Sequence, residues 1–207
     1  MTDPANLETE RTEPRRAAVR RRTRETDVRV ELALDGRGDA AIRTGIGFYD
    51  HLLTSLAHHG LFDLVIEATG DVEVDDHHTA EDVALVLGSA FAAALGDRSG
   101  IRRFGDASVP MDESLATAVV DLGGRPYAVI ELPFRAERIG ALSSQLVEHA
   151  LEAFARTAGA TLHVRGSGRN DHHLAEATFK ALALALRSAC EVDPRRSGPA
   201  STKGVAG

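Results

Sequence analysis

One polar motif occurs twice in this chain, and the duplication constrains the fold more than any other sequence feature. Each copy has two adjacent histidines and a glutamate three positions after the second: His77, His78 and Glu81, then His172, His173 and Glu176. Each copy also opens a long apolar segment with helical spacing. A repeat of roughly a hundred residues is too long for a solenoid unit, so we expect two similar units packed into one body.

The segments around the two motifs follow the same order of predicted elements. In the first half we predict a hairpin over 27–45 turning at Asp35-Gly36, a helix over 48–60, a strand and a shorter strand within 61–74, and a helix over 75–97. In the second half we predict a hairpin over 113–134 turning at Gly123-Gly124, a helix over 142–159, a strand over 161–168 and a helix over 171–189. The prediction is an α+β fold with two strand-strand-helix-strand-helix halves and sheets carrying helices on one face.

Length and composition set the domain organisation. A chain of 207 residues that is 43% hydrophobic can bury one core. We predict a flexible arm over 1–14 and a single catalytic domain over 15–207, with halves of about 22–100 and 101–192 and a C-terminal tail. The arginine-rich run from Arg15 to Arg24 is interpreted as a solvated arm, with regular structure beginning near Thr26.

Charge and cysteine content exclude several classes of protein. The net charge of −7 disfavours a general polyanion binder, so no nucleic-acid partner is expected. Cys190 is the single cysteine, which rules out an internal disulfide. No apolar run is long enough for a membrane span, and no secretory signal is recognised. We therefore predict a cytoplasmic protein without a membrane partner.

The duplicated motif is typical of a metal site. At 100° per residue, Glu81 falls between His77 and His78 around the helix, while the two neighbouring imidazoles diverge and suit two different ions. Two further histidines, His51 and His149, precede their motifs by 26 and 23 residues. The repeat thus supplies six imidazoles and two carboxylates as candidate ligands.

The donor types indicate the class of metal. Three imidazoles and one carboxylate per ion leave positions open on an octahedral metal such as Mn²⁺ or Fe²⁺, as a substrate-binding site requires. A closed structural zinc site would favour thiolates. For one copy alone, helix capping by Asp75 and Asp76 would be an adequate explanation, but the duplication favours metal binding. His58, His59 and His163 lack a repeated acidic partner and are interpreted as ordinary histidines.

Nine sequence motifs between about Arg22 and Lys203 belong together: "RRTRET", "TGIGFYDHLL", "DDHHTAEDVALVLG", "GIRRFG", "PMDESLA", "GGRP", "LVEHAL", "NDHHLAEATFKA" and "STKG". In these motifs the sequence resembles the imidazoleglycerol-phosphate dehydratase family of histidine biosynthesis. Tyr49 and Thr202 depart mildly from the family pattern, and neither is a candidate ligand.

The resemblance implies two Mn²⁺ ions per active site, in sites at the subunit interfaces of a homo-oligomer, a 24-mer built from trimers. The implied ligand sets are His51, His78, His172 and Glu176 for one ion, and His77, Glu81, His149 and His173 for the other. Exchanging the two halves of the repeat converts the first set into the second. The implied phosphate contacts are Arg103, Arg125 and Lys203 with Ser201 and Thr202 nearby, and Glu25 matches a residue at the substrate.

The implied reaction removes water from imidazole glycerol phosphate to give imidazole acetol phosphate. The proton to be removed lies on a carbon without a neighbouring carbonyl, so direct carbanion formation is costly. A metal-stabilised imidazolate could expel the hydroxyl and form a diazafulvene, whose neighbouring C–H is acidic. Glu25 is then the acid/base candidate, while Glu81 and Glu176 serve the catalytic centre primarily as ligands.

Three other functions are compatible with parts of the pattern. A dinuclear hydrolase would use a similar metal pair, although the excess of imidazole over carboxylate disfavours it. A metal-storage or metal-sensing oligomer would not need open coordination positions or phosphate-binding arginines. A nucleotide loop at "GIGF" is weakly indicated, because Gly45 and Gly47 lack the third glycine of such loops.

Overall fold

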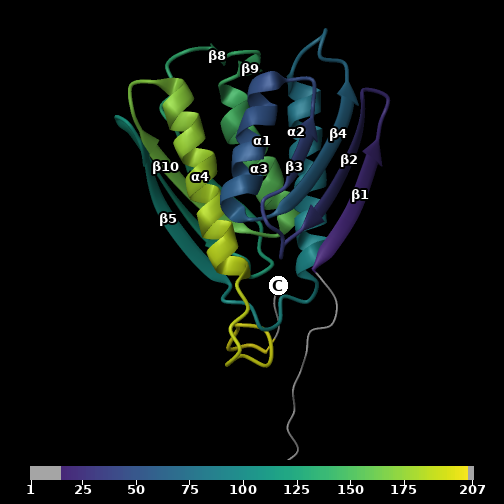
Figure 1. Cartoon of the computed structure of the whole chain (residues 1–207), viewed down its shortest axis with the longest axis vertical. Helices are drawn as coiled ribbons and strands as arrows, with labels where there is room; N and C mark the ends of the chain where they lie inside the picture. The colour runs from purple at the N-terminus through teal and green to yellow at the C-terminus, as the bar shows by residue number, and fades with distance from the viewer. Residues whose placement is uncertain (1–14, 205–207) are drawn as a thin grey trace, which may run out of the picture.

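The computed structural model describes residues 15–204, so the predicted flexible arm over 1–14 lies outside the described residues. Four helices form a central layer between two four-stranded mixed sheets (Figure 1). The helices are α1 (Gly47–Gly60), α2 (His77–Leu95), α3 (Gln145–Ala158) and α4 (Asp171–Cys190). The first sheet has the order β1-β2-β4-β3, the second β5-β6-β10-β7, and β8 (Arg138–Ile139) with β9 (Leu142–Ser143) forms a short ribbon.

The strands follow the same order in both halves. The first sheet comprises β1 (Arg16–Arg22), β2 (Thr26–Ala33), β3 (Ala40–Arg43) and β4 (Asp63–Gly70); the second comprises β5 (Phe104–Met111), β6 (Ser114–Asp121), β7 (Tyr127–Glu131) and β10 (Thr161–Ser167). Apart from the short β8–β9 ribbon before α3, each half therefore runs through three strands, a helix, a strand and a second helix. The α+β class and the internal duplication are confirmed.

Each sheet turns one face toward the helices. In β2, Val28, Val30 and Leu32 are buried and alternate with more exposed residues, as the two-residue period of a half-buried strand requires. Helices from different halves pack together, α1 against α4 and α2 against α3. The two halves thus share one core rather than folding as separate bodies. No helix within residues 15–204 is both long and apolar enough to cross a membrane.

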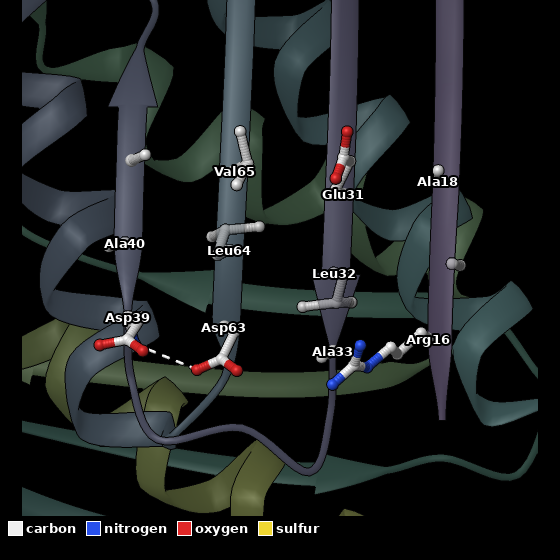
Figure 2. Close-up of a pocket in the computed structure, with 12 residues that line it drawn as sticks. Arg16, Ala18, Glu31, Leu32, Ala33, Asp39, Ala40, Asp63, Leu64 and Val65 are labelled. Atoms are coloured by element: carbon white, nitrogen blue, oxygen red, sulfur yellow. Dashed lines mark hydrogen bonds between the residues drawn. The ribbon is translucent and has the colours of Figure 1, made fainter. Parts of the chain in front are cut away.

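The two predicted hairpins are wrong in their strand pairing. β4 lies between β2 and β3, pairing antiparallel with β2 and parallel with β3, and Figure 2 shows the four strands of this sheet side by side. The connection after β2 is held at the start of β4, where Asp63 Oδ1 accepts hydrogen bonds from the Arg37 and Asp39 N–H groups at 2.7 and 3.2 Å. In the second half, β10 lies between β6 and β7 in the same way.

The structure also corrects the extent of the strands. Residues 16–22, interpreted as a solvated arm, form β1, which pairs antiparallel with β2 along its whole length. β5 forms a hairpin with β6 through Asp112 and Glu113, in a region where the sequence analysis had assigned no element. The shorter strand predicted at Val72 and Val74 is instead an exposed turn.

Candidate functional site

The helix starts carry most of the predicted metal ligands to one end of the molecule. The side chain of Asn170 accepts hydrogen bonds from the His172 and His173 N–H groups and begins α4, and Asp75 Oδ1 accepts one from His77 N–H at 2.8 Å. Asp76 does not cap its own helix, because its carboxylate accepts hydrogen bonds from Ser143, just before α3. The hydrogen bonds that begin α2 and α4 are therefore made to the histidines themselves and fix where these residues lie.

The first candidate metal group lies between α1 and α4. His51 Nε2 is 2.8 Å and His172 Nε2 is 3.0 Å from Glu176 Oε1. Lys180, one turn further along α4, places its Nζ 2.6 Å from the other oxygen of this carboxylate. Burial raises the pKa of Glu176, but the hydrogen bonds from Lys180 and the two histidines outweigh it and lower the pKa to about 2. The carboxylate is ionised at neutral pH.

The second group lies between α2 and α3 and is the counterpart of the first. His77 Nε2 and His149 Nε2 lie 3.8 and 3.4 Å from the oxygens of Glu81, and Arg156 donates a hydrogen bond to Glu81 at 2.9 Å. Burial raises the pKa of Glu81, yet the bond from Arg156 and the neighbouring His149 keep it below its ordinary value. The His149 Nε2 atom is buried and makes no hydrogen bond within the described chain.

These two groups fit a divalent metal ion. In each, one ligand atom per residue lies within 4.8 Å of the others. A buried imidazole nitrogen without a hydrogen-bond donor is costly unless another group uses its lone pair, and a metal ion does so. The donors are nitrogen and oxygen with no thiolate, which suits Mn²⁺ or Fe²⁺ as well as other first-row ions.

The remaining two predicted ligands do not join these groups within one chain. His78 turns toward Asp71, with Nδ1 3.0 Å from Oδ2, and His173 turns toward Glu113, with Nδ1 3.0 Å from Oε2. The hydrogen bond to Asp71 raises the pKa of His78. The structure thus brings together three of the four residues in each set implied by the family resemblance.

Glu25, the acid/base candidate, lies at the same end of the molecule. Its Oε2 is 3.9 Å from His78 Nδ1, and its side chain is 56% exposed, so the carboxylate is open to a ligand. Glu25 immediately precedes β2, as Glu113 immediately precedes β6.

The predicted phosphate-binding residues form a separate cluster. Arg103 Nε and Nη2 donate to the two oxygens of Asp121 at 2.6 and 2.9 Å, while Nη1 donates to the carbonyl of Ala200 at 2.7 Å. Arg125 Nη2 lies 3.9 Å from Asp121. Arg103 has a positive φ of 73°, which non-glycine residues rarely adopt.

The C-terminal segment joins this cluster. Ala200 is bound by Arg103, the Lys203 N–H donates to Ser201 Oγ at 3.2 Å, and the side chains of Thr202 and Lys203 are exposed. The C-terminal tail therefore contacts Arg103, whose partner Asp121 also faces Arg125, and substrate binding by this tail stays a prediction.

Several residues of the site were not found from the sequence. Lys180 stands four positions after Glu176 on α4, a helical spacing that would have justified looking for an ion pair. Asp121 ends strand β6, where this spacing rule does not apply. Asp71, Glu113 and Arg156 come from other elements, and their sequence neighbourhoods carry no comparable signal.

The fold and the site define a class of duplicated α+β proteins, with two related His–His–Glu groups that could hold metal ions at one end of a helical layer and an arginine cluster beside the C-terminal segment. The family model of imidazoleglycerol-phosphate dehydratase matches residues 44–186. The imidazoleglycerol-phosphate dehydratase of Methanocella arvoryzae is 54% identical over 92% of this chain and 99% of its own, and the chloroplastic one of Pisum sativum is 54% identical over 93% and 69%.

Solved structures agree with the sequence comparison. The dehydratase of Pyrococcus furiosus superposes with a TM-score of 0.79 at 36% identity, covering 90% of this chain and 99% of its own. That of Staphylococcus aureus gives 0.77 at 34% identity, covering 85% and 98%. The chain belongs to the imidazoleglycerol-phosphate dehydratase family. This confirms the resemblance inferred from the motifs, and with it the enzyme class, a hydro-lyase.

Proposed function

We propose that this chain dehydrates imidazole glycerol phosphate to imidazole acetol phosphate in histidine biosynthesis, using two Mn²⁺ ions per active site. The observation that carries the proposal is the pair of related groups, His51–His172–Glu176 and His77–Glu81–His149, each with its donor atoms within 4.8 Å. The duplicated groups provide the imidazole-rich ligation with open positions that a substrate-binding metal pair needs.

We further propose that the active site is completed by neighbouring copies of the chain, in a 24-mer built from trimers. Each group has three candidate ligands, and the fourth histidine of each set points elsewhere.

The distance between the two clusters within one chain also supports this proposal. The backbone N–H of Arg103 bonds to the Ala189 carbonyl near the end of α4, whereas His172 lies at the beginning of α4. At 1.5 Å per residue this separation along the helix is about 25 Å. A glycerol phosphate carrying one imidazole ring is much shorter, so the metal groups and the phosphate cluster of one chain serve different substrate molecules.

The residues of the chain have distinct tasks in this reaction. Arg103, Arg125 and Lys203 supply positive charge for the phosphate, and the guanidinium groups can donate paired hydrogen bonds to its oxygens. Ser201 and Thr202 add hydroxyl donors beside them. The bound ions would stabilise negative charge on the imidazole of the substrate, which makes the neighbouring hydroxyl a better leaving group.

The two glutamates of the metal groups and Glu25 differ in their surroundings. Glu81 and Glu176 are ionised by their cationic neighbours and serve as ligands. Glu25 has no such cationic partner at hydrogen-bond distance among the described residues and is exposed. We assign to its carboxylate the transfer of a proton at the substrate carbon or hydroxyl. Replacing Glu25 with Gln should abolish most turnover at unchanged metal content, and near-normal turnover would remove this residue from the mechanism.

The test of the whole proposal is metal reconstitution. The purified protein is assayed on imidazole glycerol phosphate before and after chelation, and then with single metals restored one at a time. We expect loss of activity on chelation and recovery with Mn²⁺. Full turnover by demonstrably metal-free protein would reject the proposed chemistry, and hydrolysis of the phosphate instead of dehydration would favour the dinuclear hydrolase.

A further inference from the structure

The two outward histidines meet carboxylates on the same ring nitrogen. His78 Nδ1 lies 3.0 Å from Asp71 Oδ2 and 3.9 Å from Glu25 Oε2. His173 Nδ1 lies 3.0 Å from Glu113 Oε2 and 3.8 Å from Asp112 Oδ2. In both cases one carboxylate is within hydrogen-bond distance of Nδ1.

Glu113 is held in a fixed orientation by the backbone around it. Its Oε1 accepts hydrogen bonds from Asn170 N–H at 2.8 Å, Arg169 N–H at 3.1 Å and Ser114 Oγ at 3.0 Å. Only Oε2 is left for His173. The carboxylate therefore joins the β5–β6 turn to the start of α4 and faces the imidazole with a single oxygen. Its hydrogen bond to His173, followed by that from Asn170, lowers the pKa of Glu113 well below its usual range.

Asp71 reaches His78 from a different place in the fold. It lies in the turn between β4 and α2, and both of its oxygens are within 3.2 Å of His78 Nδ1. Glu113, in contrast, lies between β5 and β6. The internal repeat relates Glu113 not to Asp71 but to Glu25, which also faces His78 Nδ1, at 3.9 Å. The carboxylate within hydrogen-bond distance comes from the turn after β4 in the first half and from the β5–β6 turn in the second. Each outward histidine thus has a carboxylate at Nδ1, although different segments supply it.

An ionised carboxylate can only accept a hydrogen bond, so the imidazole nitrogen facing it must carry the proton. Nδ1–H on each outward histidine leaves the lone pair on Nε2, and carboxylate partners of this kind also raise the basicity of a ligating imidazole. We propose that Asp71 and Glu113 are positioning residues that fix His78 and His173 with Nε2 as the metal-binding atom, ready for an ion shared with another copy of the chain. This inference rests on the proposed function, since it assigns the partners of two of its ligands.

Glu113→Gln is the sharpest test because the structure determines how glutamine will sit. The three donors around Oε1 require the amide oxygen there, which leaves the amide NH₂ facing His173 Nδ1. The imidazole must then accept at Nδ1 and carry its proton on Nε2, where it blocks the metal. Asp71→Asn tests His78, and within residues 15–204 the hydrogen bonds of the Asp71 side chain go to His78 alone, so this change disturbs little else.

The measurement is a calorimetric titration of the chelator-stripped full-length protein with Mn²⁺, together with thermal unfolding of the metal-free form. We expect each variant to bind Mn²⁺ about 10–100-fold more weakly, with Asp71→Asn unfolding at the wild-type temperature. Glu131→Gln is the control, since Glu131 is exposed and, in the part of the chain that the structure describes, its side chain pairs only with Arg165, at 3.0 Å. It should bind Mn²⁺ like the wild type.

The outcomes separate the inference from the proposed function. If the wild type shows no stoichiometric binding of Mn²⁺, the proposed metal-dependent function itself fails. If the wild type binds and both variants bind equally tightly, the inference is overturned while the function stands. If Asp71→Asn binds Mn²⁺ more weakly and unfolds at the wild-type temperature, the positioning role of Asp71 is supported even if Glu113→Gln proves unstable.

Discussion

At the scale of single residues, Asp121 determines how Arg103 can meet a phosphate. The carboxylate occupies one edge of the guanidinium, and the Ala200 carbonyl takes a further N–H, so the group is fixed in one plane. Burial raises the pKa of Asp121, but the paired bonds from Arg103 lower it further than burial raises it. A Cβ at Gly123 would lie 2.5 Å from Arg103 Nη2, so a side chain there would displace this guanidinium.

Arg103→Lys keeps the positive charge but cannot reproduce these directed hydrogen bonds. We expect KM for the phosphorylated substrate to rise by about 10-fold or more, with a smaller change in kcat. Steady-state kinetics measure both. Arg102→Lys is the control, because Arg102 is exposed and pairs with Glu191 at 2.7 Å. Equal effects of the two substitutions would contradict a specific role for Arg103.

Cys190 gives a prediction about reactivity. The residue is 2% exposed at the end of α4, and burial raises the pKa of its thiol to about 12. The thiolate is the reactive form, so at pH 8 the native protein should react with a thiol reagent only as fast as it unfolds. Labelling rates measured at increasing urea should follow unfolding, and rapid stoichiometric labelling without denaturant would show that Cys190 is accessible in the native fold.

At the scale of secondary-structure elements, α2 and α3 approach each other closely at Gly88 of α2. A Cβ at this position would lie 2.1 Å from Thr157 Oγ1 and 2.6 Å from the Phe154 carbonyl, both on α3. The absence of a side chain is what allows these helices to approach, and their approach places His149 beside His77 and Glu81.

Gly88→Ala should therefore destabilise the protein, although alanine has the higher helix propensity. Overpacking of this kind costs about 1–3 kcal/mol. Urea unfolding of the metal-free protein measures the effect. Gly47→Ala is the matched helical control, because a Cβ there meets nothing within 4 Å, and it should change stability by less than about 1 kcal/mol. Equal stability of the two variants would show that α2 and α3 can separate without cost.

The elements also show what sequence could and could not predict. All four helices were predicted from apolar spacing because each buries a continuous stripe of side chains. β1 was missed because its inward positions include Ala17 and Val19 among arginines, which give only a weak apolar alternation. The hairpins were mispaired because pairing of β4 between β2 and β3 depends on contacts distant in sequence, and a local Asp-Gly turn carries no information about them.

The candidate site also combines features that a local sequence pattern predicts with features that depend on contacts distant in sequence. The candidate ligands His77 and Glu81 were recognisable because a motif of fixed spacing was repeated. The grouping of His149 with them depends on α2 packing against α3, which no local pattern encodes. Asp71 and Glu113 lie in turns outside the repeated motif, so only the folded chain shows that they face the outward histidines.

At the scale of the whole molecule, the two functional clusters lie at opposite ends of the helical layer. α4 runs from the histidine end to the C-terminal segment, as its course toward the yellow loop in Figure 1 shows. The histidines stand at the helix starts, whereas Arg103 contacts the end of α4 through Ala189. If one small substrate engages both clusters, as we propose, they must come from two copies of the chain, because α4 holds the clusters of one chain apart.

This separation predicts complementation between two inactive variants. Glu176→Gln damages the metal group and Arg103→Ala the phosphate cluster, and each alone should abolish most activity. When the two are dissociated, mixed and reassembled, some sites receive an intact metal group from one chain and an intact phosphate cluster from another. Activity should then rise above that of either variant, measured against each variant reassembled alone. If both clusters of a site came from the same chain, every site in the mixture would carry one defect and no activity would return.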